Sequence, residues 1–415
     1  MQETKTVIVA GGGVGGIIAA NELRRRLPKP HRVVLIERNP VHAFAPSFLW
    51  LMTGDRTPEQ ISRPLASLLR PGVELVQAVL EGINPTAQSV ATSDGELRFD
   101  HLVLALGAEL APELIPGLIE SGFASFYSLE SAKQLRQTLH SFSAGRIALV
   151  VCAMPYKCPG APHEGAMLIA EFFRRRGLLD AVELDLFSPE SQPMPVGGPK
   201  LGRAVVQMLA MKGVSFYPQH KLIRVDGQAR QLFFEGRKAW DYDLLIAVPP
   251  HRAPVLLKAA GLANEAGWVP VERRSLETKV PCIHALGDLT AIPIPGRWQP
   301  DTPLMLPKAG VFAHAQAEVV AERIAAAVCG RQATAEFCGQ GYCMLEAGSG
   351  YAGFAHGNFL AEPMPQLEMR NLGRAWHLGK VLFEQWWLAP FGLRKTALHA
   401  ALKIGIKALK LPLQL

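Results

Sequence analysis

Thr6-Val-Ile-Val-Ala-Gly-Gly-Gly-Val-Gly-Gly16 is an apolar run that ends in a cluster of glycines, close to the start of the 415-residue chain. A helical pattern covers residues 17–27, and a second apolar run, Arg32–Glu37, ends in an acid. A strand, a glycine turn, a helix and a second strand in this order predict a βαβ unit with parallel strands. The sequence therefore predicts an α/β protein.

The spacing of the glycines indicates what this turn binds. Gly11, Gly13 and Gly16 form a G-x-G-x-x-G pattern between strand and helix. Gly11 makes the tight turn, Gly13 lets the backbone approach a pyrophosphate, and Gly16 packs the helix on the strand. Glu37 stands about 20 residues further on, where a carboxylate binds ribose hydroxyls. We therefore expect a bound dinucleotide; the alternative is the glycine turn of an unrelated α/β protein.

Three later segments are expected to complete this domain. The strand that starts at Asp100 closes on Gly107, in a turn typical of the point where a chain leaves an FAD-binding domain. The strand that starts at Cys282 ends in Asp288, whose short carboxylate can reach the ribityl hydroxyls of a flavin. Lys308 precedes the helix predicted over 311–328 and can face the flavin pyrimidine carbonyl; the alternative is a solvated lysine. We expect an FAD-binding domain formed by residues 1–108 and 275–330.

A second strand-turn-helix unit lacks the glycines of the first. The strand 147–151 and the helix predicted over 166–176 are joined by Cys152-Ala-Met-Pro-Tyr-Lys-Cys-Pro-Gly-Ala-Pro-His-Glu164. The next strand, Val182–Phe187, is followed by Ser188-Pro189 and not by an acid. Both parts of a nicotinamide-nucleotide fingerprint are missing, which argues against NADH as the electron donor. Residues 109–274 are expected to form a second Rossmann-like domain.

Cys158 is the candidate reactive group of this second unit. It lies just upstream of the predicted helix, with Pro162 near the first turn. The positive end of the helix dipole and Lys157 are expected to favour a thiolate. Glu164, near the helix start, is a candidate proton shuttle. We expect Cys158 to be half of a redox pair beside a flavin; the alternatives are an inert buried thiol and, for Glu164, a helix-capping carboxylate.

Cys343 lies in a third segment, inside a strand predicted over 341–346, and the alternative for it is a core cysteine. Cys152 ends a strand and is expected in the core. The remaining cysteines are Cys282, Cys329 and Cys338. Because no two cysteines have C-x-x-C spacing, the sequence predicts no metal site.

The C-terminal segment, residues 331–415, ends in an amphipathic helical pattern from Lys395 to Leu411. One face is basic and consists of His399, Lys403, Lys407 and Lys410. Another is apolar and consists of Leu398, Leu402, Ile406 and Leu409, with Ala401 and Ile404 beside it. Such a helix, with Trp386 and Trp387 nearby, suits a membrane surface and a quinone-facing role; the alternative is packing on the domain or in a dimer.

The charge and the hydropathy of the chain also favour a location at a membrane surface. The net charge is +7, yet no nucleic-acid-binding motif is present, so an anionic membrane surface is the expected partner. No apolar run is long enough to span a bilayer, and no basic n-region precedes the first strand. We expect a peripheral protein on the cytoplasmic face of a membrane, without a signal peptide. The sequence leaves open whether copies of the chain form a homo-oligomer.

The order of these motifs resembles the sulfide:quinone oxidoreductases and the related flavocytochrome c sulfide dehydrogenases. The resemblance covers nearly the whole chain. Its most specific parts are the segment around Cys158 and Pro249-Pro-His-Arg-Ala-Pro254. It also includes the first glycine turn, Glu164, Gly287-Asp288, Pro307-Lys-Ala-Gly310 and Gly341-Tyr-Cys343.

The resemblance implies an FAD-dependent enzyme that oxidises sulfide, reduces a membrane quinone and releases polysulfide or zero-valent sulfur. The redox pair would be Cys158 and Cys343, with Glu164 as acid/base and Lys308 near the flavin. Many members carry a third cysteine where residues 123–129 have none. The flavocytochromes attach flavin through a cysteine in the segment corresponding to 41–52, which also has none, so non-covalent FAD is expected.

Three other functions remain open from the residues alone. A type II NADH:quinone oxidoreductase would share the fold and the tail. A flavocytochrome-type sulfide dehydrogenase subunit would normally be exported and would partner a cytochrome. A non-catalytic FAD-binding protein would have inert thiols.

Overall fold

The computed structural model describes residues 3–299, 301–409 and 411. Its first sheet is parallel and has the order β20-β9-β1-β2-β5. The strands are β1 (Thr6–Ala10), β2 (Arg32–Ile36), β5 (Glu74–Val76), β9 (His101–Leu104) and β20 (Ile283–Ala285). β1 and β2 pair in parallel on either side of the glycine turn, so the predicted βαβ unit is confirmed. β20 joins the sheet from far along the chain because the polypeptide returns to it after the second sheet.

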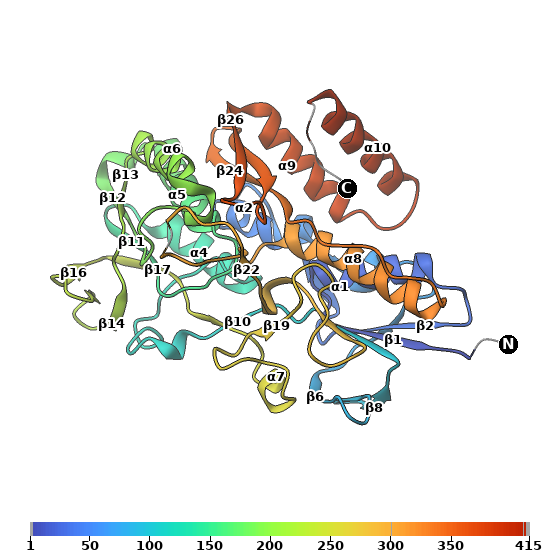
Figure 1. Ribbon diagram of the computed structural model, residues 1–415. Helices are drawn as coiled ribbons and strands as arrows, with labels where there is room; N and C mark the ends of the chain where they lie inside the picture. The colour runs from blue at the N-terminus through green and yellow to red at the C-terminus, as the bar shows by residue number, and fades with distance from the viewer. Residues whose placement is uncertain (1–2, 300, 410, 412–415) are drawn as a thin grey trace.

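Helices α1 (Val14–Arg26) and α8 (Gly310–Val328) lie side by side on this sheet (Figure 1). Successive residues of β1 point to opposite faces of the sheet, so both faces are packed. Val7 and Val9 pack under the helices, whereas Ile8 packs on the opposite face. That opposite face is covered by α7 (Leu256–Ala259) and the small antiparallel sheet β6 (Leu80–Asn84), β7 (Ser89–Thr92) and β8 (Gly95–Arg98).

The second sheet is also parallel and has the order β13-β12-β11-β17. Its strands are β11 (Gly145–Val151), β12 (Val182–Phe187), β13 (Val214–Tyr217) and β17 (Leu244–Val248). One face packs on α4 (Leu129–Ser141), α5 (Ala161–Arg175) and α6 (Gly198–Met211). The other packs on β14 (Leu222–Asp226), β15 (Gln231–Phe234) and β16 (Trp240–Asp241). Cys152 lies in this second core and is 1% exposed, as predicted.

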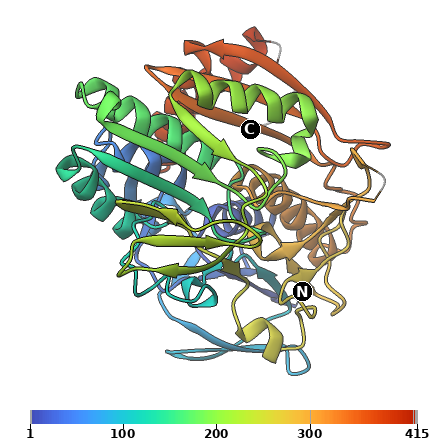
Figure 2. The same ribbon diagram turned by 90° about the vertical axis from the view of Figure 1, so that its left-hand side faces the viewer.

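A third, antiparallel sheet follows and consists of β24 (Gln340–Gly348), β25 (Tyr351–Asn358) and β26 (Gln366–Gly373). The strand predicted over 341–346 is thus confirmed. β24 packs against α5 of the second sheet, and Figure 2 shows the orange-red strands next to the green helices. The segment between β2 and β5 forms α2 (Phe48–Met52), α3 (Pro58–Ile61) and the hairpin β3 (Val41–Ala43) and β4 (Ser62–Pro64). The remaining two-residue strands are β10 (Glu109–Leu110), β18 (His251–Arg252), β19 (Val269–Pro270), β21 (Thr290–Ala291), β22 (Pro293–Ile294) and β23 (Leu304–Met305).

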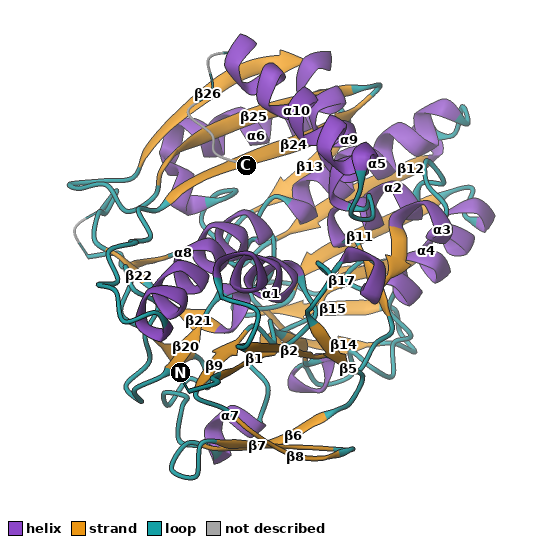
Figure 3. Cartoon of the chain, turned by 90° about the vertical axis from the view of Figure 1, so that its right-hand side faces the viewer, coloured by secondary structure: helices purple, strands orange, loops and turns teal. Residues whose placement is uncertain are grey.

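The chain ends in two helices, α9 (Arg374–Trp387) and α10 (Leu393–Ala408), which pack against each other (Figure 3). Leu402 is buried and Leu398 is half-buried, both against the same core as Trp386 and Trp387. The prediction that their stripe faces a membrane is therefore wrong for these two leucines, because they anchor α10 to the protein. Lys410 lies outside the described residues. No described helix is both long enough and apolar enough to cross a membrane.

Candidate active site

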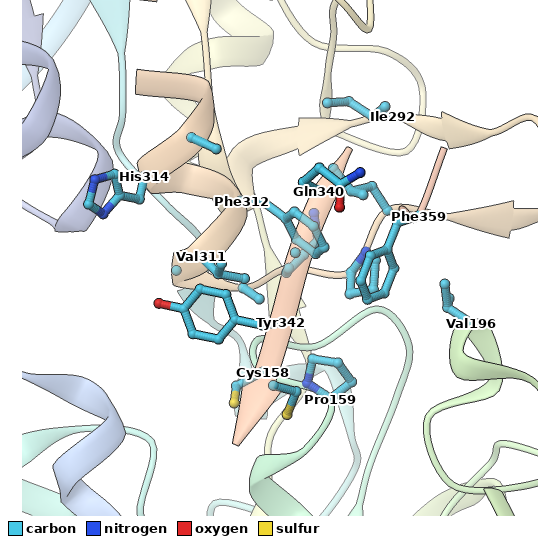
Figure 4. A pocket seen from close by; sticks show the side chains of 18 of the residues that line it. Cys158, Pro159, Val196, Ile292, Val311, Phe312, His314, Gln340, Tyr342 and Phe359 are labelled. Atoms are coloured by element: carbon cyan, nitrogen blue, oxygen red, sulfur yellow. The ribbon is translucent and has the colours of Figure 1, made fainter. Parts of the chain in front are cut away.

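A cavity of about 1050 Å³ runs between the three sheets. It is lined by a residue of the glycine turn, by both candidate cysteines, by Lys308 and by residues of α8 and α9. The lining residues include Val14, Cys158, Cys343, Lys308, Lys380 and Trp387. Figure 4 shows Cys158 and Pro159 at one end of the cavity, with Tyr342 of β24 next to them. Residues from distant parts of the sequence therefore meet around one space.

The first glycine turn has the close contacts that its spacing predicts. Gly11 has φ +108°, and a Cβ on Gly16 would lie only 1.7 Å from the Gly11 carbonyl oxygen. A Cβ on Gly13 would meet nothing within 4 Å, so the backbone there is open to a ligand. Glu37 accepts a hydrogen bond from the Gly12 N–H at 2.6 Å, which holds its carboxylate beside the turn. These residues fit the diphosphate and ribose of a dinucleotide.

His42, which was not expected from the sequence, ties helix α9 to this turn. Burial lowers its pKa, so the ring is neutral. Its Nδ1 lies 3.2 Å from the Gly12 carbonyl oxygen, and its Nε2 accepts from the Trp387 indole N–H at 2.9 Å. The pattern V-H-A in a short strand carries no signal for such a contact, since the partner stands more than 300 positions away.

Lys308 lines the cavity, and Asp288 lies next to it. The Lys308 ammonium donates to the carbonyls of Asp288 at 2.6 Å and Thr290 at 3.2 Å, and lies 3.5 Å from the centroid of the Trp268 ring. Burial lowers the pKa of Lys308 to about 8 and raises that of Asp288. Asp288 Oδ1 is buried and has no partner among the described residues. Gly107 has φ +69° with open space at its Cβ position. An unpartnered acceptor beside a lysine fits a hydroxyl-rich ligand chain.

Cys158 occupies a constrained turn at the start of α5. Its φ is +56°, and its N–H donates to the Lys308 carbonyl at 2.6 Å, which joins the two segments. The helix begins at Ala161 and not at Ala166, because Pro162 fits the first helical turn. The side chain is exposed and lines the cavity. Burial and then the charge of Glu164 raise the pKa of Cys158 to about 12. This desolvation opposes the effect of the helix dipole, so the thiolate stays a prediction.

Cys343 and Glu164 face the same first turn of α5. A Cβ on Gly160 would lie 3.4 Å from Cys343 Sγ and 3.4 Å from Glu164 Oε1, so these two atoms are neighbours. Burial raises the pKa of Cys343, and the charges of Glu164 and Cys158 add to this. None of the cysteines forms a disulfide in the part of the chain that the structure describes.

The Glu164 carboxylate points inward and does not cap its helix. Its Oε2 accepts from the Lys380 ammonium and, at 3.0 Å, from the Glu346 N–H. Lys380 lies on α9 and is buried. Burial lowers its pKa, but the charges of Glu164 and Glu346 have the opposite and larger effect, so the pKa of Lys380 is raised overall. Lys380 was not expected from the sequence, although a lysine among the aromatic residues of α9 is a detectable anomaly.

A second buried acid, Glu190, was also missed because it stands three positions after β12. Its Oε2 accepts from the Tyr156 hydroxyl at 2.9 Å and from the Ser188 hydroxyl at 3.0 Å. Burial raises its pKa to about 7. Tyr156, 3% exposed, thereby fills the space at the carboxyl ends of β11 and β12.

The sequence of this chain is similar to those of two sulfide-oxidising enzymes, the first from mouse and the second from a bacterium. The chain is 29% identical to the mitochondrial sulfide:quinone oxidoreductase of Mus musculus over 69% of its length, a match that spans about two thirds (66%) of the mouse protein. It is 28% identical to the sulfide-quinone reductase of Aquifex aeolicus, over 92% of this chain and 90% of that protein.

The solved structure of the sulfide:quinone oxidoreductase from Aquifex aeolicus has a TM-score of 0.85 to this chain at 24% identity, and the match covers 99% of this chain and 96% of that one. This similarity establishes the fold. Residues 5–317, three quarters of the chain, match the pyridine nucleotide-disulphide oxidoreductases. The chain belongs to the pyridine nucleotide-disulphide oxidoreductase family.

Proposed function

We propose that the protein is an FAD-dependent sulfide:quinone oxidoreductase whose redox pair is Cys158 and Cys343. The observation that carries the proposal is the meeting of both thiols, Glu164 and Lys308 at one cavity that also reaches the glycine turn. The named relatives support the same reaction, since the mouse and Aquifex aeolicus proteins carry that name.

FAD, held without a covalent bond, fits the residues of the first domain. The diphosphate would lie at Gly13, the ribose at Glu37 and the ribityl hydroxyls at the unpartnered Asp288 oxygen. Gly107 would leave room for the cofactor where the chain exits the domain. When bound, FAD supplies the redox chemistry by taking two electrons from the thiol side and giving them to quinone. The buried Lys308 would stabilise negative charge on the cofactor ring.

The two cysteines would act on sulfide in their oxidised, bridged form. Attack by hydrosulfide breaks the S–S bond between Cys158 and Cys343 and forms a new one, which leaves a persulfide and a thiolate. Glu164 lies beside the pair and can accept the proton that the sulfide brings. Further sulfide would release the sulfur as a polysulfide or as zero-valent sulfur.

The second domain is a poor site for NADH. Tyr156 and Glu190 occupy the carboxyl ends of β11 and β12, where a nicotinamide nucleotide would bind in a Rossmann-like fold. Glu190 Oε2 already accepts hydrogen bonds from Tyr156 and Ser188 and is not available to a ribose. This observation disfavours the type II NADH:quinone oxidoreductase.

We further propose that α9 and α10 dock the protein on the cytoplasmic face of a membrane and admit quinone to the cavity. Phe383 and Trp387 of α9 line the cavity. On the outer side, Leu378, Leu393 and Ile404 are 64%, 92% and 69% exposed. Exposed lysines of α10 would contact anionic headgroups.

The decisive experiment follows the flavin absorbance anaerobically while sulfide and then NADH are added. Sulfide is expected to bleach the flavin and NADH is not. Cys158→Ser and Cys343→Ser should each abolish bleaching, while Cys329→Ser, at the end of α8, should leave it unchanged. Bleaching by NADH alone, or full activity of either serine variant, would refute the proposal.

Membrane docking is tested by co-sedimentation with anionic lipid vesicles. Burying an exposed leucine or isoleucine is worth about 1.5 kcal/mol or more, so Leu393→Ser and Ile404→Ser should each weaken binding at least about tenfold. Ile119→Ser, an exposed residue outside the two helices, serves as the control. Equal vesicle binding by all variants would argue for a different docking face.

A further inference from the structure

A small pocket lies between α3 with β4 and the turn that joins α9 to α10. It has a volume of about 60 Å³ and is lined by Gln60 and Arg63 from the first segment and by Gln385 and Arg394 from the second. Because a single water needs about 10–15 Å³ of such space, the pocket can hold a few waters or one small polar group. Two guanidinium groups from distant parts of the chain therefore line one space.

An acid, Glu384, also lines the pocket, but its charge is already compensated. Its side chain is 6% exposed, and Nη2 of Arg56 lies 3.0 Å from its Oε2. The Ser47 hydroxyl donates to its Oε1. Because this carboxylate is held by its own partners, it does not offset the positive charges of the two lining arginines.

Both lining arginines keep hydrogen-bond donors for a ligand. Nη1 of Arg63 donates to the carbonyls of Glu59 at 2.8 Å and Ser62 at 2.6 Å, which holds the guanidinium at the pocket. In the described part of the chain, its Nε and Nη2 have no hydrogen-bond partner, and neither Arg63 nor Arg394 forms an ion pair. Arg394 stands in the first turn of α10, where the helix dipole adds positive charge. Two planar guanidinium groups suit a phosphate, which accepts paired hydrogen bonds.

The surroundings of the pocket indicate the source of such a phosphate. Leu393, next to Arg394, is 92% exposed, and Phe391 on the same turn is 36% exposed. Apolar side chains of this kind enter the boundary between lipid headgroups and acyl chains. With Leu393 at that depth, the neighbouring arginine lies at the level of the headgroups, where anionic lipids attract basic residues. A soluble phosphate would leave the leucine in water.

We propose that this pocket binds the phosphate of an anionic lipid headgroup between Arg63 and Arg394. The inference rests on the membrane docking proposed above and adds a defined lipid site to it. The bound phosphate would link β4 of the first domain to α10. One lipid would therefore fix the orientation of the protein on the bilayer, with the turn between α9 and α10 inserted.

The test is co-sedimentation with phosphatidylcholine vesicles that contain phosphatidylglycerol, at constant ionic strength. Arg63→Lys and Arg394→Lys keep the charge but lose the planar fork that matches a phosphate. The matched control is Lys403→Arg, the reverse change at an exposed position of α10 outside the pocket. Flavin content and thermal unfolding verify that each variant is folded.

We expect each lysine variant to bind these vesicles about threefold or more weakly, and Lys403→Arg to bind them like the unaltered protein. Unchanged binding by both lysine variants would overturn the site. A gain in Lys403→Arg as large as the loss in Arg394→Lys would also overturn it, because the bilayer would then prefer arginine at any position.

Two further results separate the lipid site from the docking on which it rests. If Leu393→Ser weakens vesicle binding but the lysine variants do not, the docking stands and the site falls. If the unaltered protein does not bind the vesicles, both fall. Inorganic phosphate without vesicles is expected to leave the thermal unfolding temperature unchanged. A rise that Arg63→Lys and Arg394→Lys abolish would assign the pocket to a soluble phosphate and overturn the lipid ligand.

Discussion

The two strand-turn-helix units of this protein share a backbone plan but use it differently. In the first, Gly13 leaves open space above the turn, and a ligand can approach the main chain. In the second, Tyr156 and Cys158 fill the corresponding place, and the Cys158 N–H is used by the Lys308 carbonyl. The comparison teaches that one turn leaves its backbone open to a ligand, whereas the other places a cysteine side chain at the cavity.

The largest effect should come from substitution of Gly16, because only glycine fits at this position of the first turn. Gly16→Ala places a Cβ 1.7 Å from the Gly11 oxygen, so strand and helix must separate. We expect loss of flavin and destabilisation of more than about 4 kcal/mol. Flavin content and chemical unfolding measure both.

Gly13→Ala is the matched control for this change, because its Cβ meets nothing within 4 Å. It should fold normally and lose only affinity for the cofactor. If Gly16→Ala behaved like Gly13→Ala, the contrast between a packing glycine and a ligand-facing glycine would not hold.

The stability of the second strand-turn-helix unit should depend on the buried ion pair between Lys380 and Glu164. Lys380→Met leaves Glu164 buried without its counter-charge, which costs about 3–5 kcal/mol. Because Lys380 lowers the pKa of Cys158, the thiol should also alkylate more slowly at a given pH. Urea unfolding and alkylation rates test this. Lys403→Met, an exposed lysine of α10, should change neither; a stable Lys380→Met would contradict the account.

A pH effect should appear where the two units join, at Lys308. Its pKa is lowered to about 8, so the charge is present below that pH and is lost above it. The rate constant kcat/KM for sulfide should fall by about tenfold as pH rises through this range, a loss of about 1.4 kcal/mol. Lys308→Arg keeps its charge and should lack this decline. A decline of the same size in Lys308→Arg would assign it to another group.

The smallest effect should come from a change in Tyr156, whose ring packs in the turn of the second unit. Tyr156→Phe keeps the ring but removes the hydrogen bond to Glu190, which should cost about 1 kcal/mol. NADH should still fail to bleach the flavin, since the ring continues to occupy the crevice. Thermal unfolding and an NADH titration measure the two outcomes. Rapid reduction by NADH in this variant would mean that the hydrogen bond, and not the ring, excludes the nucleotide.

Local patterns predicted most of the regular structure. The helix expected over 311–328 is α8, and the strand expected over 341–346 lies within β24. The boundary errors have local causes, as at α5, where Pro162 starts the helix earlier than the apolar pattern indicates. The face of α10 was misjudged because an apolar stripe looks the same whether it meets lipid or protein.

By itself the sequence determined the first domain and the identity of its ligand class, because a tight turn and a close helix-strand contact admit only glycine at Gly11 and Gly16. The sequence also marked Cys158 by what its turn lacks. Only the tertiary structure decided that Glu164 meets Lys380 and Glu346, and that Glu190 meets Tyr156. The reason is physical: a backbone constraint acts between neighbouring residues, whereas the pairing of buried charges depends on which distant elements pack together and exclude water.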